Sequence, residues 1–300
     1  MRTITDFSSN YDGDPIRYFN FGDLDNGNEN LVFHYGISSA NSNVDNDKFN
    51  IFLDLEEPSS SLHLYPREFE NKFSLVLSIC PYYTEFVNRR FSQNSAKREC
   101  VFFPFNRKDI PSHGEKINEV IYTGQMNGTG IEEILEILSH FKNRVVSFGP
   151  NRFSTDVNVS YHQKLNLVSQ SKISIIHNLI FPQSAHIEEI KKSDLYKENG
   201  AFSHLEDFIY PQLKSRTFEA AFCKTLMLVQ KDPWNLIELY FKPGKDFIYF
   251  DGKDDLRLKI NQILENYSEY QEMIENAFEK AINNYTTEDF YNQYILKYEK

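Results

Sequence analysis

The chain has 300 residues, of which 40% are hydrophobic and 25% are charged, and its formal net charge is −11. This length is sufficient for two domains that each bury their own core. Because the chain is acidic and contains no Lys/Arg block, the composition excludes a nucleic-acid backbone as the expected partner.

The N-terminal stretch "MRTITDFSSNYDGDP" lacks the apolar segment of a signal peptide, and no window approaches the length of a membrane span. The cysteines, Cys80, Cys100 and Cys223, are scattered without C-x-x-C spacing, so a disulfide framework is not expected. We therefore expect a cytoplasmic protein without a transmembrane segment; a peripheral membrane contact stays open.

The first third of the chain contains short apolar runs that are near-continuous rather than alternating, a pattern typical of strands buried on both faces of a parallel sheet. We expect strands at 30–37, 49–55, 73–79 and 100–105, and a helix at 82–93. The polar stretch "NRKDIPSHGEKIN" at 106–118, with Pro111 and Gly114, is the best linker candidate.

After this linker, strands and helices alternate again. Apolar spacing predicts a helix over 129–142, with Thr129 and Glu132 as a capping box, and closing helices over 256–267, 270–282 and 287–298. Further helices are expected at 161–170 and 216–222, and strands at 119–125, 143–149, 172–178, 225–230 and 246–250.

This repeated alternation predicts an α/β fold with two doubly wound domains, in which ligands bind at the carboxyl ends of the strands. The expected boundaries are 1–112 for the first domain and 113–285 for the second, and 286–300 form a helix that packs back on the first.

One acidic residue stands out in the second domain. Glu219 lies in the otherwise apolar run from Phe218 to Phe222, and a buried carboxylate is costly unless another group pairs with it. Glu219 is therefore either at the surface or functional.

The segments "SRTFEAAFCKTLMLV", "YFKPGKDFIYFDGKDDLRLKINQIL" and "AINNYTTEDFYNQYI" resemble the donor-binding half of group 1 glycosyltransferases with the GT-B fold, closest to the CgeB-like (spore-maturation-like) subset. The resemblance covers roughly residues 117–295. It implies two Rossmann-like domains with an interdomain cleft. It also implies transfer of a sugar from a nucleotide-diphosphate donor to an acceptor that the N-terminal domain holds.

Carried onto this sequence, the resemblance assigns Glu219 to the ribose hydroxyls of the donor. Arg216 and Lys214 are the candidates for the diphosphate, since guanidinium and ammonium groups bind phosphate well; a solvated helix start is the alternative for Lys214. The other candidate donor-binding residues are Thr217, Gly124, Gln125, Asn178 and Trp234. A purely structural turn is the alternative for Gly124. Trp234 lies in a loop that would shape the sugar pocket, and packing is its alternative. His177, beside Asn178, is a further candidate for base or sugar contacts.

Two positions depart from the family pattern. Retaining members carry a second glutamate eight residues before the first, where this chain has Pro211, and the family's glycine at the end of the motif is Lys224 here. Retaining chemistry is therefore not assigned. Lys224 indicates either a changed turn or an additional cation near the donor.

An inverting transferase needs a general base near the acceptor hydroxyl. In "FLDLEEPSS" at 52–60, Glu57 is the first candidate and Glu56 the second, and an ordinary acidic loop is the alternative. His34 is the third candidate, with a buried core histidine as its alternative.

No His/Cys/Asp cluster has metal-ligand spacing, and the GT-B enzymes that the sequence resembles generally work without a bound metal. We therefore expect no metal and no cofactor beyond the nucleotide sugar, linked to UDP or GDP. The expected acceptor is a glycan, lipid or protein. The alternatives are a fucosyltransferase-like enzyme that uses GDP-fucose and a non-catalytic module that binds a nucleotide or glycan.

Overall fold

The computed structural model describes residues 2–5, 21, 24, 30–35, 44–55, 71–91, 96–124, 130–180, 197 and 210–298. The chain divides into two compact units. Unit 1 comprises Met1–Pro104, Pro182–Gln212 and Thr287–Lys300, and unit 2 comprises Phe105–Phe181 and Leu213–Thr286. The domain boundaries expected from the sequence, near 112 and 285, stay predictions.

Unit 1 contains a parallel sheet with the strand order β1-β2-β3-β4-β5. Its strands are β1 (Arg2–Thr5), β2 (Leu31–Tyr35), β3 (Phe49–Asp54), β4 (Leu75–Ser78) and β5 (Lys97–Cys100), and α2 (Pro81–Phe91) connects the last two. Nearly every residue of β3 and β4 is buried, as the near-continuous apolar runs predicted. The parallel sheet is therefore confirmed.

The strand predicted at 100–105 is wrong. The strand ends at Cys100, and the apolar residues that follow are buried outside the sheet. Pro104 cannot donate a ladder hydrogen bond, and Phe102 packs edge-on against Phe290. Strand β5 was not predicted because its sequence, KREC, is charged rather than apolar. It lies at the edge of the sheet, and Arg98 is its only buried residue.

Unit 2 contains a second parallel sheet with the order β13-β12-β9-β6-β7-β8. The strands are β6 (Asn118–Thr123), β7 (Asn143–Ser147), β8 (Asp156–Val157), β9 (Ser171–Ile176), β12 (Leu226–Gln230) and β13 (Ile248–Phe250). Apart from β8, each lies within about two residues of its predicted range.

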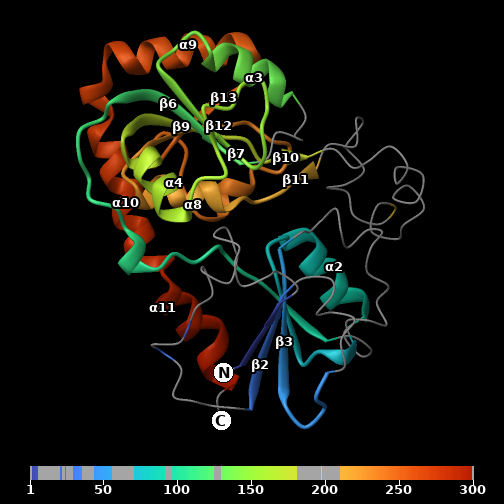
Figure 1. Cartoon of the computed structure of the whole chain (residues 1–300). Helices are drawn as coiled ribbons and strands as arrows, with labels where there is room; N and C mark the ends of the chain where they lie inside the picture. The colour runs from blue at the N-terminus through green and yellow to red at the C-terminus, as the bar shows by residue number, and fades with distance from the viewer. Residues whose placement is uncertain are drawn as a thin grey trace. The chain divides into compact units, whose positions relative to one another are not determined.

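Helices cover both faces of this sheet, which makes unit 2 doubly wound (Figure 1). One face carries α3 (Ile131–Leu138) and α9 (Gly252–Glu265), and the other carries α4 (Tyr161–Ser169) and α8 (Ser215–Phe222). Helix α10 (Gln271–Asn284) contacts α8. Short elements complete the chain: β10 (Leu179–Ile180), β11 (Tyr210–Pro211), and 3₁₀ turns at Arg107–Asp109, Leu236–Leu239 and Tyr267–Tyr270.

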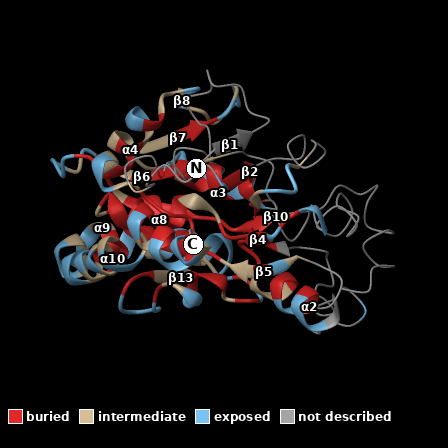
Figure 2. Cartoon of the chain, turned by 90° about the horizontal axis from the view of Figure 1, so that it is seen from below, coloured by how far each residue is buried: buried red, intermediate tan, exposed pale blue. Residues whose placement is uncertain are grey.

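Helix α8 is buried on all sides, whereas α9 and α10 have an exposed face (Figure 2). Every residue from Arg216 to Phe222 is buried, and Phe222 stacks on Phe105 at 4.3 Å between ring centroids. A helix without a solvent face must satisfy its polar side chains internally, which includes Arg216 and Glu219.

The capping box predicted for α3 is wrong at its first residue. Helix α3 begins after Gly130, which adopts a left-handed φ of 69° and provides no side-chain cap. Thr129 lies outside the described residues. A capping box does occur at α4, where Ser160 and Gln163 exchange side-chain-to-backbone hydrogen bonds.

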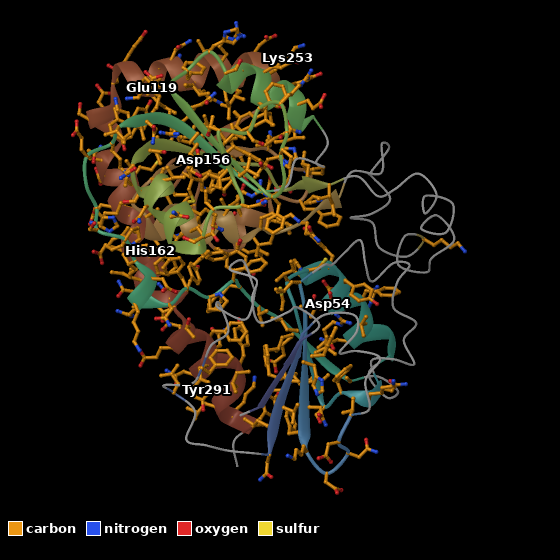
Figure 3. All side chains as sticks on the ribbon, in the orientation of Figure 1. Asp54, Glu119, Asp156, His162, Lys253 and Tyr291 are labelled. Carbon is orange, nitrogen blue, oxygen red and sulfur yellow. The ribbon has the colours of Figure 1, made fainter. Side chains whose placement is uncertain are left out.

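The last predicted helix is a composite of three helical types. Residues Thr287–Phe290 form α11, Tyr291–Ile295 form a π-helical turn, and Leu296–Tyr298 form a 3₁₀ turn. Within unit 1, Phe290 stacks on Phe21. The ring centroid of Tyr291, which is labelled in Figure 3, lies 5.6 Å from that of Phe21. No helix in the described part of the chain is long and apolar enough to cross a membrane.

Candidate functional site

The strands β6, β9 and β12 of unit 2 end at one edge of the sheet, because all three run parallel. Val229 of β12 pairs with Ile176 of β9, so Asn178 and Lys231 each follow two residues after this pair. Gly124 directly follows β6, and its N–H donates a hydrogen bond to the carbonyl of Val146 on the neighbouring strand β7. The sequence-predicted residues of this edge therefore gather where a doubly wound sheet binds ligands.

Arg216 reaches this edge from α8. Its side chain is buried, with 9% of the residue exposed, and its guanidinium Cζ lies 4.8 Å from the ring centroid of Tyr122. The Nη1 atom has no hydrogen-bond partner among the described residues. A buried guanidinium with an unsatisfied N–H is costly, so it marks a position where an anion would be favourable.

Gly124 permits the close approach of this guanidinium. A Cβ added to Gly124 would lie 2.4 Å from Nη2 of Arg216 and 3.0 Å from its Cζ, and the φ of Gly124 is +128°. No other residue fits this turn without displacing Arg216. The glycine predicted on sequence grounds therefore has a specific structural reason.

Glu219 is paired rather than exposed. Only 1% of the residue is exposed, and its Oε1 accepts a hydrogen bond from Nζ of Lys164 at 2.8 Å. Lys164, on α4, also lies over the ring of Tyr161 at 4.7 Å, and 21% of its side chain is exposed. The two charges form a largely buried ion pair that joins α4 to α8.

Two further predicted donor residues carry buried polar atoms. Both amide atoms of Asn178 and the hydroxyl of Thr217 have no hydrogen-bond partner among the described residues. Native proteins leave few such atoms unsatisfied, so each indicates a ligand or water contact. His177 is also buried at this edge.

The loop after β12 is organised around Asp232. Its Oδ1 accepts the backbone N–H of Trp234 at 2.9 Å and that of Leu236 at 3.4 Å. Burial raises the pKa of Asp232 to about 6, and the charge of Glu238 acts in the same direction. Trp234 belongs to this loop and is buried, and the loop is the one predicted to shape the sugar pocket.

The structure resolves the role of Lys224. The residue has a left-handed φ of 50°, so the turn after α8 keeps the conformation that a glycine would favour. Its Nζ pairs with Glu275 at 2.5 Å and lies over the ring of Phe278. Lys224 therefore binds α10 in place of acting as a cation at the carboxyl edge.

Lys214 is the N-cap residue of α8, and its side chain makes no capping hydrogen bond. Gln125 lies outside the described residues, as do the base candidates Glu56 and Glu57. His34 belongs to unit 1, where its Nε2 is 3.0 Å from Oδ1 of Asn50 and its ring contacts Phe73. These are the contacts of a core histidine, and a role as general base stays a prediction.

Asp54 ends β3 in unit 1 (Figure 3). Its Oδ2 lies 3.9 Å from Nη1 of Arg98. Arg98 is fully buried, and its guanidinium lies over the ring of Tyr83. Within the described residues, no group of three His, Cys, Asp or Glu side chains is arranged to hold a metal ion.

Sequence reasoning missed Lys164 as a partner of the site. It lies 55 residues before Glu219, and no local pattern links the two. Only the placement of α4 and α8 on the same face of the sheet brings them together.

The sequence profile of a family described as glycosyl transferase-like matches residues 131–295, more than half of the chain. No curated protein matches the sequence significantly.

Solved structures show the fold. A structure of a point mutant of S. aureus TarM in complex with fondaparinux, alpha-GlcNAc-glycerol and UDP has a TM-score of 0.61 at 11% identity, over 93% of this chain and 57% of that one. Anabaena HepE in complex with UDP-glucose has a TM-score of 0.58 at 10% identity, over 88% and 77%. Sucrose-phosphate synthase from Thermosynechococcus elongatus has a TM-score of 0.57 at 10% identity, over 88% and 71%.

These neighbours have the GT-B fold, and the α/β fold class with two Rossmann-like parallel sheets is confirmed. The chain spans 57% of the length of TarM.

Proposed function

The chain belongs to the glycosyl transferase-like family, and from that premise we propose that it transfers a sugar from a nucleotide-diphosphate donor to a glycan, lipid or protein acceptor. The observation that carries the proposal is Arg216, a buried guanidinium at the carboxyl edge of unit 2 whose Nη1 lacks a partner among the described residues. A diphosphate supplies the anionic oxygens that such a group needs.

In this proposal, the diphosphate binds at the turn after β6, where Gly124 leaves room for the guanidinium. Glu219 accepts hydrogen bonds from the ribose hydroxyls. Lys164 holds the Glu219 carboxylate in place through its hydrogen bond to Oε1. Arg216 also stabilises the nucleoside diphosphate as it leaves, because negative charge grows on its oxygens as the glycosidic bond breaks.

The complexes of TarM with UDP and of HepE with UDP-glucose support a UDP-linked donor. A GDP-linked donor is the alternative, for a fucosyltransferase-like enzyme that uses GDP-fucose. The segment "SRTFEAAF" supports the CgeB-like subset. The scattered cysteines support action in the cytoplasm. Glu57, then Glu56 and His34, remain the proposed general bases, and the interdomain cleft and independence of metal ions remain proposals.

A non-catalytic nucleotide- or glycan-binding module is the second candidate, favoured by Pro211 in place of the family's second glutamate. Hydrolysis of the donor distinguishes the two. An enzyme releases UDP or GDP slowly from at least one member of a panel of sugar nucleotides, whereas a binding module binds nucleotide and releases none.

Glu219→Ala tests the site itself. We expect nucleotide affinity to fall while the secondary structure measured by circular dichroism is retained. The same substitution at the exposed Glu133 of α3 serves as the control. Equal affinity of Glu219→Ala and wild type for UDP and GDP removes Glu219 from the site.

A further inference from the structure

Two side chains at the ends of β9 and β12 carry polar atoms that the nucleotide contacts do not use. Asn178 is 1% exposed and Asp232 is 3% exposed. Both amide atoms of Asn178 and Oδ2 of Asp232 lack a hydrogen-bond partner among the described residues. Buried polar atoms in native proteins are nearly always satisfied, so these atoms indicate a ligand that bears several hydrogen-bonding groups.

The two residues belong to one place in the fold. Because β9 and β12 are neighbours and parallel, the segments that follow Ile176 and Val229 leave the same edge side by side. Neighbouring strands are separated by about 4.8 Å, which is within the span of one monosaccharide. Gln230, the last residue of β12, adds a buried Oε1 that also lacks a partner among the described residues.

The carboxylate of Asp232 is held in place rather than mobile. Its Oδ1 is fixed by the backbone N–H groups of Trp234 and Leu236, which leaves Oδ2 as the atom available to a ligand. Such preorganisation lowers the entropic cost of binding. Although burial raises the pKa of Asp232 to about 6, the group is ionised at pH 7.5 and accepts hydrogen bonds.

Charge separates this position from the phosphate position. Among the described residues, none forms an ion pair with Asp232, so its negative charge is not neutralised and repels a phosphate or another carboxylate. Hydroxyl groups, in contrast, donate to a carboxylate and both donate to and accept from a carboxamide. The edge therefore presents a cation, Arg216, beside β6 and a carboxylate with a carboxamide beside β9 and β12.

We propose that Asp232 and Asn178 bind hydroxyl groups of the donor sugar and select a neutral sugar over an acidic one. The inference rests on the proposed function, since it takes the nucleotide at Arg216 and Glu219 as given. It names the class of donor: a sugar nucleotide whose sugar has free hydroxyls and no carboxylate.

The test compares nucleotide with sugar nucleotide by isothermal titration calorimetry at pH 7.5. The probes are UDP, GDP, UDP-glucose, UDP-galactose, UDP-N-acetylglucosamine and GDP-mannose, together with the uronate of the neutral donor that binds most tightly. The variants are Asp232→Asn, which keeps the Oδ1 acceptor and the loop, and Asn178→Ala.

We expect Asp232→Asn to lower the affinity for the neutral sugar nucleotide about 10-fold, while the affinity for the free nucleotide stays within about 2-fold of that of wild type. Wild type binds the uronate more weakly than the neutral donor, and in this variant the affinity for the uronate rises relative to the affinity for the neutral donor. Asn178→Ala lowers the affinity for the neutral donor and leaves the affinity for the free nucleotide unchanged. Asp246→Asn is the control for the removal of a buried charge away from the site. Asp246 is also buried in a loop of unit 2 and accepts the backbone N–H of Lys242, and it differs from Asp232 in its ion pair with Lys280.

Two results overturn the inference and leave the proposed function standing: unchanged affinity of Asp232→Asn for every sugar nucleotide, or equal loss for nucleotide and sugar nucleotide. A wild-type protein that binds none of the probes overturns the proposed function, and the inference with it.

Discussion

Replacing Lys164 by methionine is expected to destabilise unit 2, because it leaves the buried carboxylate of Glu219 without its cation. At the observed 2.8 Å between Nζ and Oε1, two unit charges attract by about 6 kcal/mol if the effective dielectric constant is near 20. Desolvation offsets part of this, and removal of one partner from a buried pair typically costs about 3–5 kcal/mol. Since water reaches the lysine, whose side chain is 21% exposed, we expect a loss of about 2–3 kcal/mol.

Trp234 provides the assay, because it is the only tryptophan of the chain and belongs to unit 2. Its fluorescence during urea denaturation reports the unfolding of that unit. In the double variant Lys164→Met with Glu219→Gln, no uncompensated charge remains, so we expect at least 1 kcal/mol of the loss to return, roughly the net value of one charged hydrogen bond.

Lys172→Met is the control, since Lys172 lies over the ring of Tyr267 and forms no ion pair within the described residues. It should change the free energy of unfolding by less than about 1 kcal/mol. A Lys164→Met variant as stable as this control would show that the ion pair does not hold Glu219. The same conclusion follows if the double variant is no more stable than Lys164→Met alone.

Three further predictions concern the same unit. Gly124→Ala should lower nucleotide affinity at least 10-fold in calorimetry, because the added Cβ would lie 2.4 Å from Nη2 of Arg216 and displace the guanidinium; an affinity equal to that of wild type would contradict the assigned contact. Ser160→Ala should lower the free energy of unfolding by about 1 kcal/mol through loss of the α4 cap, and no loss in urea titrations would contradict this. For Asp232, whose folded pKa of about 6 exceeds the ordinary 3.8, the folded state binds more protons between these values. Wild-type stability should therefore fall by up to about 3 kcal/mol as pH rises from 4 to 7 relative to Asp232→Asn, and parallel pH profiles would refute it.

Local sequence patterns predicted the second domain well, because its signals are local. Near-continuous apolar runs identified the parallel strands, and helical spacing identified α9 and α10. The first unit was predicted less well. In particular, β1 was missed, and the strand expected at 100–105 ends where it was expected to begin, since burial of an apolar run does not distinguish a central strand from a packed loop.

The candidate site shows the same division. Glu219 and Arg216 could be named as candidates from the sequence, because a charge in an apolar helical run is conspicuous and these positions match a family motif. Lys164 was not found, since its contact with Glu219 depends on the packing of α4 against α8. The partnerless Oδ2 of Asp232 was also not foreseeable, because satisfaction of a side-chain atom is a property of the folded loop.

The most direct test of the central claim, that the carboxyl edge of unit 2 binds a nucleoside diphosphate through Arg216, is the affinity of Arg216→Met for UDP and GDP by calorimetry. Arg152→Met is the control, since Arg152 is exposed and pairs with Glu132 and Glu136 on α3. We predict that wild type and the control bind one of the two nucleotides equally well, and that Arg216→Met binds it about 100-fold more weakly, about 3 kcal/mol. Equal affinities of Arg216→Met and wild type would contradict the claim.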